Sequence, residues 1–226
     1  MRKILPYDRD YQIIETMKWM PPGEETGFSG RERGYFLLER HVERMADAAL
    51  HAGFRFDSAR LRRRLLETAS GFENRPYRVR ALLHFDGRLD VSFAPLDETP
   101  GRVIVGMSTH QVDSSDPFLY FKTTRRAPFD EEHARAVARG WFDVIFTNER
   151  GEVTEGAIST IFARQADGRL LTPPVSSGLL PGTLRQSLID ASVAVEQVLY
   201  PDDLKNAETV YAGNSVRGLV EAGLAE

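Results

Sequence analysis

Residues 118–126 read FLYFKTTRR: an apolar run, which predicts a strand over residues 117–122, ends in a single lysine, Lys122. Lysines at strand ends are commonly solvated surface residues. A lysine that is partly buried beside other cations has a lowered pKa, since burial and like charge both disfavour the ammonium. Its neutral amine can then form a Schiff base with an aldehyde. The stretch therefore leaves two interpretations of Lys122 open, and Arg125 and Arg126 are the cations that favour the second.

The composition indicates a globular protein with its own hydrophobic core. The chain has 226 residues, of which 42% are hydrophobic and 27% charged, so we expect one or two domains. A net charge of −4 argues against a nucleic-acid partner. There is no cysteine, and the five histidines show no close metal-ligand spacing, so we expect no metal site. No apolar run is close to the length of about 18 residues that a membrane span needs. The N-terminus lacks an apolar signal core. We therefore expect a cytoplasmic protein without a membrane partner.

The first half of the chain predicts a small α+β domain over residues 1–97. Residues 11–19 are typical of a strand, and apolar residues at helical spacing predict a helix over residues 35–52 that stops at Gly53. Asp57 is expected to cap a second helix over residues 58–70. Two strands, at 77–84 and 88–94, flank Asp86-Gly87, which is a hairpin signal.

The second half predicts a larger domain over residues 102–226, which carries Lys122. Residues 95–101, PLDETPG, are typical of a domain junction. The pattern predicts a helix capped by Asp130 and ending at Gly140, and another over residues 182–193. Strands are expected at residues 102–108, 117–122, 142–147, 158–163, 169–172 and 208–212.

Glu155 is a candidate for acid chemistry. It lies in residues 152–162, EVTEGAISTIF, beside an apolar strand and before a glycine. It is either an ordinary hairpin carboxylate or an acid that faces a protonated ring nitrogen through a charge-assisted hydrogen bond. Pyridoxal phosphate needs such a partner to keep its ring an electron sink.

Three segments are candidates for binding an anion. Residues 178–185, GLLPGTLR, precede a predicted helix, whose free backbone N–H groups and dipole favour a phosphate. Asn214 and Ser215 offer side-chain donors after a strand, and Arg44 lies one helical turn from His41. The alternatives are a plain helix start, a turn and an exposed helix arginine.

Taken in order along the chain, these motifs resemble the fold type IV pyridoxal-phosphate enzymes, also called class IV aminotransferases. The resemblance extends over nearly the whole chain. It rests on FLLERHVERM (36–45), FLYFKTTRR (118–126), FDVIFTNERGEVTEGAISTIF (142–162), SGLLPGTLR (177–185) and ETVYAGNSVRGL (208–219).

The resemblance implies a two-domain α/β fold, with pyridoxal 5′-phosphate in a cleft between the domains, and a homodimer acting on a small molecule. Lys122 would bind the cofactor covalently and then act as general acid and base. Glu155 would pair with the pyridine nitrogen. Arg44 and the backbone amides of Thr183 and Leu184 would bind the phosphate. Asn214 and Ser215 would line the phosphate side or the side of a substrate carboxylate.

Within the family, the chain looks most like the 4-amino-4-deoxychorismate lyases. Leu184 stands where many of the aminotransferases carry a hydroxyl residue, and an aliphatic residue there is similar to the lyases. Thr160 replaces a common asparagine, and Phe121 a frequent histidine. A threonine at the place of Thr16 lies near the substrate in the lyase half of fused synthase/lyase proteins. The implied reaction releases pyruvate and 4-aminobenzoate, a folate precursor. A transaminase for branched-chain or D-amino acids and a non-catalytic relative are the alternatives.

Overall fold

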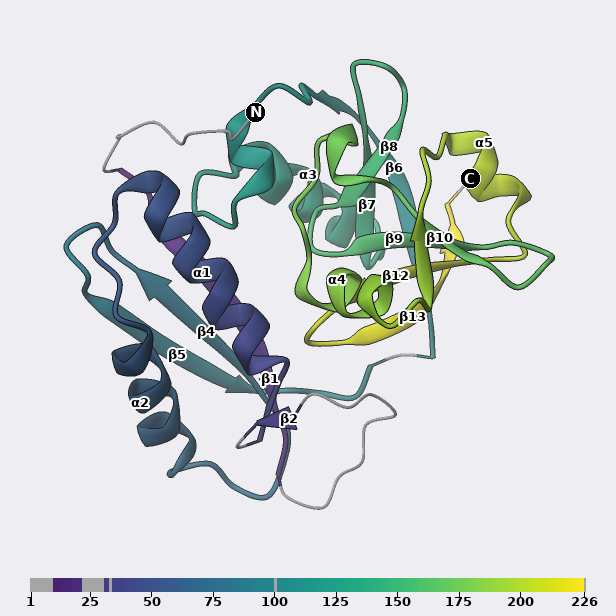
Figure 1. Cartoon of the computed structure of the whole chain (residues 1–226). Helices are drawn as coiled ribbons and strands as arrows, with labels where there is room; N and C mark the ends of the chain where they lie inside the picture. The colour runs from purple at the N-terminus through teal and green to yellow at the C-terminus, as the bar shows by residue number, and fades with distance from the viewer. Residues whose placement is uncertain (1–9, 22–30, 33, 100, 226) are drawn as a thin grey trace. The chain divides into compact units, whose positions relative to one another are not determined.

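The structure, a computed structural model, describes residues 10–21, 31–32, 34–99 and 101–225 (Figure 1). The chain divides into two compact units. The first unit is Met1–Glu98 together with Phe121–Arg125, and the second is Thr99–Tyr120 together with Arg126–Glu226.

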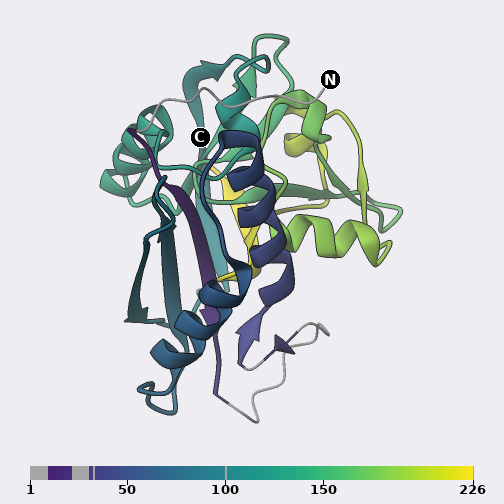
Figure 2. The ribbon, with the colours of Figure 1, turned by 60° about the vertical axis from the view of Figure 1, so that its left-hand side comes forward.

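The first unit is an antiparallel sheet covered by helices. The strands lie in the order β2-β3-β1-β4-β5. Helices α1 (Leu38–Ala52) and α2 (Ser58–Ala69) lie on the same face of this sheet (Figures 1 and 2). The strands are β1 (Ile13–Trp19), β2 (Arg31–Glu32), β3 (Tyr35–Phe36), β4 (Tyr77–Leu83) and β5 (Leu89–Pro95).

Strand register sorts the side chains of this sheet onto two faces. Ile13 of β1 pairs with Leu83 of β4, and each further pair runs antiparallel to it. Every second residue of β4, from Tyr77 to Leu83, is buried, while Arg78 and Arg80 are exposed. The buried set lies beneath the helices, as period-two alternation requires of a half-covered sheet.

The helix ends of the first unit follow the expected capping chemistry. The Asp57 carboxylate accepts hydrogen bonds from the backbone N–H groups of Ala59 and Arg60 at 2.9 and 3.0 Å. Gly53 ends α1 in the left-handed region, with φ 71°. The expected start at residue 35 is wrong, because the backbone of Tyr35 pairs with that of Trp19 in the sheet and α1 begins only at Leu38.

The strand expected at residues 117–122 is absent. Residues Pro117–Tyr120 form a 3₁₀ turn instead, and the Asp116 carboxylate accepts the N–H of Phe118. Proline and a short capping side chain favour this turn over an extended strand. The apolar residues of the run are therefore not a strand leading to Lys122.

Lys122 belongs to the first unit rather than to the domain of residues 102–226. The N–H of Ile14 donates to the Lys122 carbonyl at 2.8 Å, and the N–H of Thr124 donates to the Gln12 carbonyl at 2.9 Å. A bridge between Ile13 and Thr123 completes the pairing. The chain thus leaves the first unit at residue 98 and returns to it for five residues.

The second unit is built on a mixed sheet of eight strands in the order β11-β10-β9-β12-β13-β6-β7-β8. Its apolar core includes Val105, Ile145, Ile161 and Val210. The strands are β6 (Arg102–Val112), β7 (Asp143–Asn148), β8 (Val153–Gly156), β9 (Thr160–Arg164), β10 (Leu170–Thr172), β11 (Ala194–Glu196), β12 (Thr209–Asn214) and β13 (Gly218–Leu224).

Three α-helices accompany this sheet: α3 (Ala127–Ala138), α4 (Thr183–Asp190) and α5 (Pro201–Asn206), with a 3₁₀ turn at Val175–Ser177. The expected cap at Asp130 is wrong. Helix α3 begins at Ala127 with Pro128 in its first turn, and Asp130 instead forms an ion pair with Arg126 at 2.8 Å. In the described part of the chain, no helix is long and apolar enough to cross a membrane, and no group of acidic or histidine side chains could hold a metal ion.

Candidate active site

In the first unit, Arg44 is held by a buried carboxylate. Its Nε lies 2.8 Å from Oε1 of Glu15, and its Nη2 lies 2.7 Å from Oε2 of the same residue. Glu15 lies on β1 and Arg44 on α1, which packs across that strand. The Arg44 side chain is 14% exposed, whereas that of Glu15 is 1% exposed. Arg44 is therefore not the exposed helix arginine that its sequence position allowed.

His41, one turn before Arg44, is the third member of this cluster. Its Nδ1 lies 2.5 Å from Oε2 of Glu15. Burial alone would raise the pKa of Glu15, but Arg44 and His41 outweigh it and hold that pKa at about 2. Burial lowers the pKa of His41, and Glu15 only partly opposes this. An ionised carboxylate accepts hydrogen bonds only, so Nδ1 of the neutral imidazole carries the proton.

Lys122 lies close to this cluster. Its carbonyl accepts the N–H of Ile14, the residue that precedes Glu15, and its charge contributes to lowering the pKa of His41. In antiparallel pairing Ile14 lies opposite Lys122, and Thr16 is on the same sheet face as Ile14. The first unit thus places Lys122 and Thr16 with Ile14 on one set of alternate positions along β1, and Glu15, which binds Arg44, on the other set.

In the second unit, Glu155 lies near the end of β8, with its side chain half-buried. Its Oε1 accepts the backbone N–H of Leu180 at 3.0 Å. The carboxylate is thereby fixed beside the segment that leads into α4. Sequence reasoning selected both Glu155 and the following helix start, and the structure brings them together.

Asp143 fixes the turn that follows Glu155. This buried carboxylate accepts the hydroxyl of Ser159 at 2.5 Å and the N–H of Ile158 at 3.2 Å. Burial raises the pKa of Asp143, and these hydrogen bonds only partly counter it. Gly156 has no side chain, and a Cβ there would lie 2.3 Å from Oδ2 of Asp143. Close approach therefore requires glycine directly after Glu155.

The start of α4 offers backbone donors for an anion. Gly182 occupies the N-cap and has no side chain to cap the helix, and Thr183 and Leu184 form its first turn. The first N–H groups of a helix have no partner within the helix and favour an anion there. The Thr160 hydroxyl lies against Gly182, 2.9 Å from where a Cβ would be.

Asn214 lies beside the turn between β8 and β9. Its Nδ2 donates to the Ile158 carbonyl at 3.1 Å, and its Oδ1 accepts the N–H groups of Val216 and Arg217, each at 2.9 Å. Ser215, next to it, is buried. Because Gly213 pairs with Thr160, the sheet brings the end of β12 to the start of α4.

Glu15, His41 and Asp143 were missed by sequence reasoning. A glutamate at period-two spacing with Ile13 and Met17, on an otherwise apolar strand face, was the one signal for Glu15. His41 and Arg44 at i and i+3 were the signal for its partners. No pattern in the sequence pointed to Asp143, since its hydrogen bonds join strand β7 to the turn between β8 and β9.

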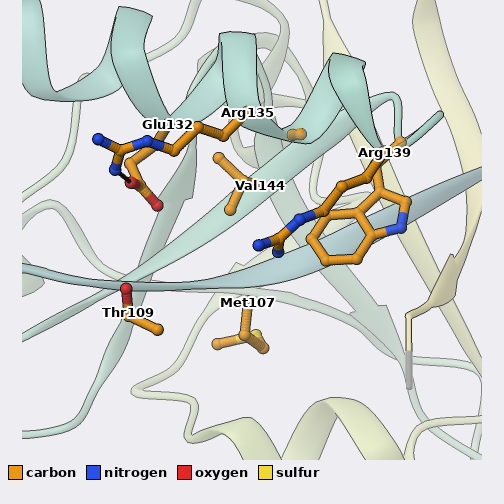
Figure 3. A pocket seen from close by; sticks show the side chains of 8 residues that line it. Met107, Thr109, Glu132, Arg135, Arg139 and Val144 are labelled. Atoms are coloured by element: carbon orange, nitrogen blue, oxygen red, sulfur yellow. Dashed lines mark hydrogen bonds and ion pairs between the residues drawn. The ribbon is translucent and has the colours of Figure 1, made fainter.

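A separate pocket in the second unit holds none of the predicted site residues. It measures about 160 Å³ and lies between α3 and strands β6 and β7 (Figure 3). Glu132 pairs with Arg135 at its edge, and the Arg139 guanidinium lies 5.0 Å from the Trp141 ring. Its lining is Met107, Thr109, Glu132, Arg135, Ala136, Arg139, Trp141 and Val144.

Comparison with known proteins points to one family. The amino-transferase class IV family model matches residues 12–223. A provisionally named aminodeoxychorismate lyase of Schizosaccharomyces pombe is 30% identical over 195 residues, which are 80% of this chain and 81% of that protein.

Solved structures show the same two-unit α/β fold. A provisionally named amino-acid aminotransferase of Mesorhizobium loti is 33% identical, with a TM-score of 0.87 over 96% of this chain and 100% of that chain. A hypothetical aminotransferase of Mycobacterium tuberculosis, in its PLP-bound form, is 20% identical, with a TM-score of 0.77 over 94% of this chain and 81% of that chain. The latter likeness concerns the fold alone.

Proposed function

Because this chain belongs to the class IV aminotransferases, a family of pyridoxal-phosphate enzymes, we propose that it is a 4-amino-4-deoxychorismate lyase. The products would be pyruvate and 4-aminobenzoate, a folate precursor. The observation that carries this choice of reaction is the match to the Schizosaccharomyces pombe protein along four-fifths of both chains. Leu184, in the first turn of α4 and 1% exposed, supports the lyase. It offers no hydroxyl, and an aliphatic residue at this position resembles the lyases.

The charged side chains and backbone donors described above fit pyridoxal phosphate. Pyridoxal phosphate supplies an aldehyde that binds amines and a ring that accepts the electrons of a breaking bond. Arg44 supplies a fixed guanidinium for the phosphate, and the N–H groups of Thr183 and Leu184 supply further donors. Glu155 supplies a carboxylate for the protonated ring nitrogen. Asn214 and Ser215 are assigned to the phosphate side or the substrate-carboxylate side.

Lys122 is assigned the proton transfers. Its amine would hold the cofactor and, once freed, would remove the proton from the substrate ring carbon that bears the nitrogen. The electron pair of that C–H bond completes the aromatic ring as the ring C–O bond breaks. The enolate oxygen would leave with the electrons of that bond, and Lys122 would return the proton to the methylene carbon of the enolate, which gives pyruvate. We assign Thr16, which shares a sheet face with the Lys122 partner Ile14, to the substrate side.

A transaminase acting on branched-chain or D-amino acids is the second candidate. The observation that favours it is the Mesorhizobium loti aminotransferase, whose whole chain matches this one at 33% identity. It would use the same Lys122 and Glu155 and would additionally need a place for a substrate α-carboxylate. A non-catalytic relative is the third candidate, and it would bind no cofactor.

The deciding experiment is a product assay with the full chain loaded with pyridoxal phosphate. We expect 4-aminobenzoate and pyruvate in equal amounts from 4-amino-4-deoxychorismate, and at least about 100-fold slower formation of both by the Lys122→Ala variant. A protein that holds the cofactor but makes neither product would contradict the lyase, and a screen of L- and D-amino donors would then test the transaminase. A protein that stays colourless with the cofactor would contradict both enzymes. We further propose a cytoplasmic homodimer, testable by light scattering and fractionation.

A further inference from the structure

The first unit buries an ionised carboxylate where the strand pattern calls for an apolar side chain. Glu15 and His41 are both 0% exposed, and the neighbours of Glu15 on its own sheet face, Ile13 and Met17, are buried apolar residues. Burying charge is costly, and a buried ion pair is often no more stabilising than apolar side chains of the same volume. Fold stability alone therefore gives a poor account of Glu15.

The geometry of the cluster restricts the Arg44 guanidinium. Two parallel bonds, from Nε to Oε1 at 2.8 Å and from Nη2 to Oε2 at 2.7 Å, fix the plane of the guanidinium as well as its position. These bonds engage two of the five N–H donors that a guanidinium carries. The other donors point away from Glu15, in directions that the two-point contact determines.

His41 fixes the carboxylate in turn. Its Nδ1–H donates to Oε2, the oxygen that also accepts from Nη2 of Arg44. A carboxylate held by two hydrogen bonds from Arg44 and one from His41 cannot rotate without breaking at least one of these bonds. His41 and Arg44 lie one turn apart on α1, so one rigid helix presents both to β1.

We propose that Glu15 and His41 are positioning residues that hold the Arg44 guanidinium ready for the phosphate of the cofactor. The proposal rests on the phosphate role assigned to Arg44 above. Neither residue needs to touch the cofactor, because both act through Arg44. If so, variants of Glu15 and His41 should bind a ligand with the phosphate more weakly, but not a ligand without it. This loss of affinity should disappear in the Arg44→Ala background.

The test compares two ligands of the cofactor-free full chain, pyridoxal 5′-phosphate and pyridoxal, which lacks the phosphate. Equilibrium titrations followed by absorbance give both dissociation constants. We expect Glu15→Gln to weaken pyridoxal phosphate binding about 10-fold to 100-fold, as outer partners of a ligand-binding residue do at metal sites. Pyridoxal binding should be unchanged. Equal weakening of both ligands would indicate general disruption and overturn the proposal.

His41 provides a second pair of variants that leaves the Glu15–Arg44 contact in place. His41→Asn keeps an N–H near the position of Nδ1 and should retain most of the affinity. His41→Leu removes the donor and should show the phosphate-dependent loss. If Glu15→Gln fails to fold, as judged by its circular dichroism, the His41 pair decides the matter. Equal pyridoxal phosphate affinity in His41→Leu and the unmodified protein would then overturn the proposal.

Arg44→Ala separates this proposal from the assignment on which it rests. We expect Arg44→Ala to weaken pyridoxal phosphate selectively, and Glu15→Gln to have no further effect in that background. If Arg44→Ala leaves the affinity unchanged, the phosphate assignment of Arg44 fails. If Arg44→Ala weakens binding but the Glu15 and His41 variants do not, only the positioning role fails. Neither result depends on whether the reaction is a lyase or a transaminase.

Discussion

Lys122 is held in place by its backbone, which has a consequence for its substitution. Its carbonyl accepts the N–H of Ile14, and Thr124 bonds to Gln12 through both its N–H and its Oγ1. An alanine at position 122 preserves these bonds. We expect Lys122→Ala to keep the melting temperature of the protein but to lower 4-aminobenzoate formation by about 100-fold to 10,000-fold or more. Lys205→Ala, which removes an exposed lysine, is the control. Retained turnover in Lys122→Ala would refute the assignment.

Glu15 and His41 also predict how the stability of the protein depends on pH. Both groups have a lower pKa in the folded chain than in the unfolded chain, where the ordinary values are 6.5 for histidine and 4.5 for glutamate. The unfolded chain therefore binds more protons in acid, and the free energy of unfolding falls as pH falls. His41 contributes to this loss of stability below about pH 6.5. The ionised form of Glu15 is stabilised by about 3 kcal/mol relative to its protonated form, and this stabilisation is lost between pH 4.5 and about 2.

Denaturant unfolding of the protein and its Glu15→Gln variant, measured between pH 7 and pH 2, checks this sign. The variant should be less stable at pH 7, and the difference between the two proteins should shrink as the solution is acidified below pH 4.5. Other carboxylates titrate in both proteins and cancel in the difference. A difference that stays constant with pH would contradict the buried, ionised state of Glu15.

The cap of helix α2 is a local feature with a local effect. The Asp57 carboxylate accepts the N–H groups of Ala59 and Arg60. Replacing it by alanine should cost about 1 kcal/mol, because the helix loses acceptors for two of its first donors. We expect hydrogen exchange at these two amides to become roughly five-fold faster in Asp57→Ala and to change little in Asp57→Asn, which keeps an acceptor. Equal exchange rates in both variants would contradict a capping role.

The turn between β8 and β9 predicts a larger cost. A Cβ at Gly156 would lie 2.3 Å from Oδ2 of Asp143 and 2.7 Å from Oγ of Ser159. We expect Gly156→Ala to lower the free energy of unfolding by about 1–3 kcal/mol and to lower activity, because Glu155 is the neighbouring residue. The matched control is Gly101→Ala, since a Cβ there meets nothing within 4 Å. Equal stability of the two variants would show that the turn adapts freely.

Elements with strong local signals were predictable from the sequence. The β4–β5 hairpin follows from Asp86-Gly87, and the end of α1 and the start of α2 follow from Gly53 and Asp57. Strands β8 and β13 were not predicted, because their pairing partners, rather than their own residue pattern, make them strands. The run at residues 118–121 has the composition of a strand, but Pro117 and Asp116 turn it into a 3₁₀ segment.

The residues of the candidate site likewise include some that the sequence predicts and some that it does not. Glu155 and the start of α4 carry motifs that can be recognised locally, and the structure joins them through the Leu180 N–H. The Glu15–Arg44 contact joins residues 29 positions apart and depends on how α1 lies across β1. Asp143 and Ser159 meet because β7 pairs with β8, which leads into the turn that holds Ser159. Sequence pattern alone contains neither relation.

At the scale of the whole chain, residues 121–125 tie the first unit to the remainder. A protease site inserted after Glu98 would cut the first of the three chain connections between the units. Residues 12–14 would still pair with residues 122–124 of the other piece. We expect the two pieces to coelute in size exclusion until denaturant is added. Thr124→Pro, which removes all three hydrogen bonds to Gln12, should weaken this association. Separation of the cut pieces without denaturant would contradict the assignment of residues 121–125 to the first unit.

The return of the chain at Lys122 also has a consequence for synthesis on the ribosome. Gln12 and Thr124 are 112 positions apart, so β1 emerges long before the segment that pairs with it. At bacterial or eukaryotic translation speeds this delay is on the order of 5 to 20 seconds. For that time the nascent first unit has Gln12 and Ile14 without the partners they have in the finished chain. Lys122 is thus among the last residues of its unit to be synthesised, after all the residues of the strands that it joins.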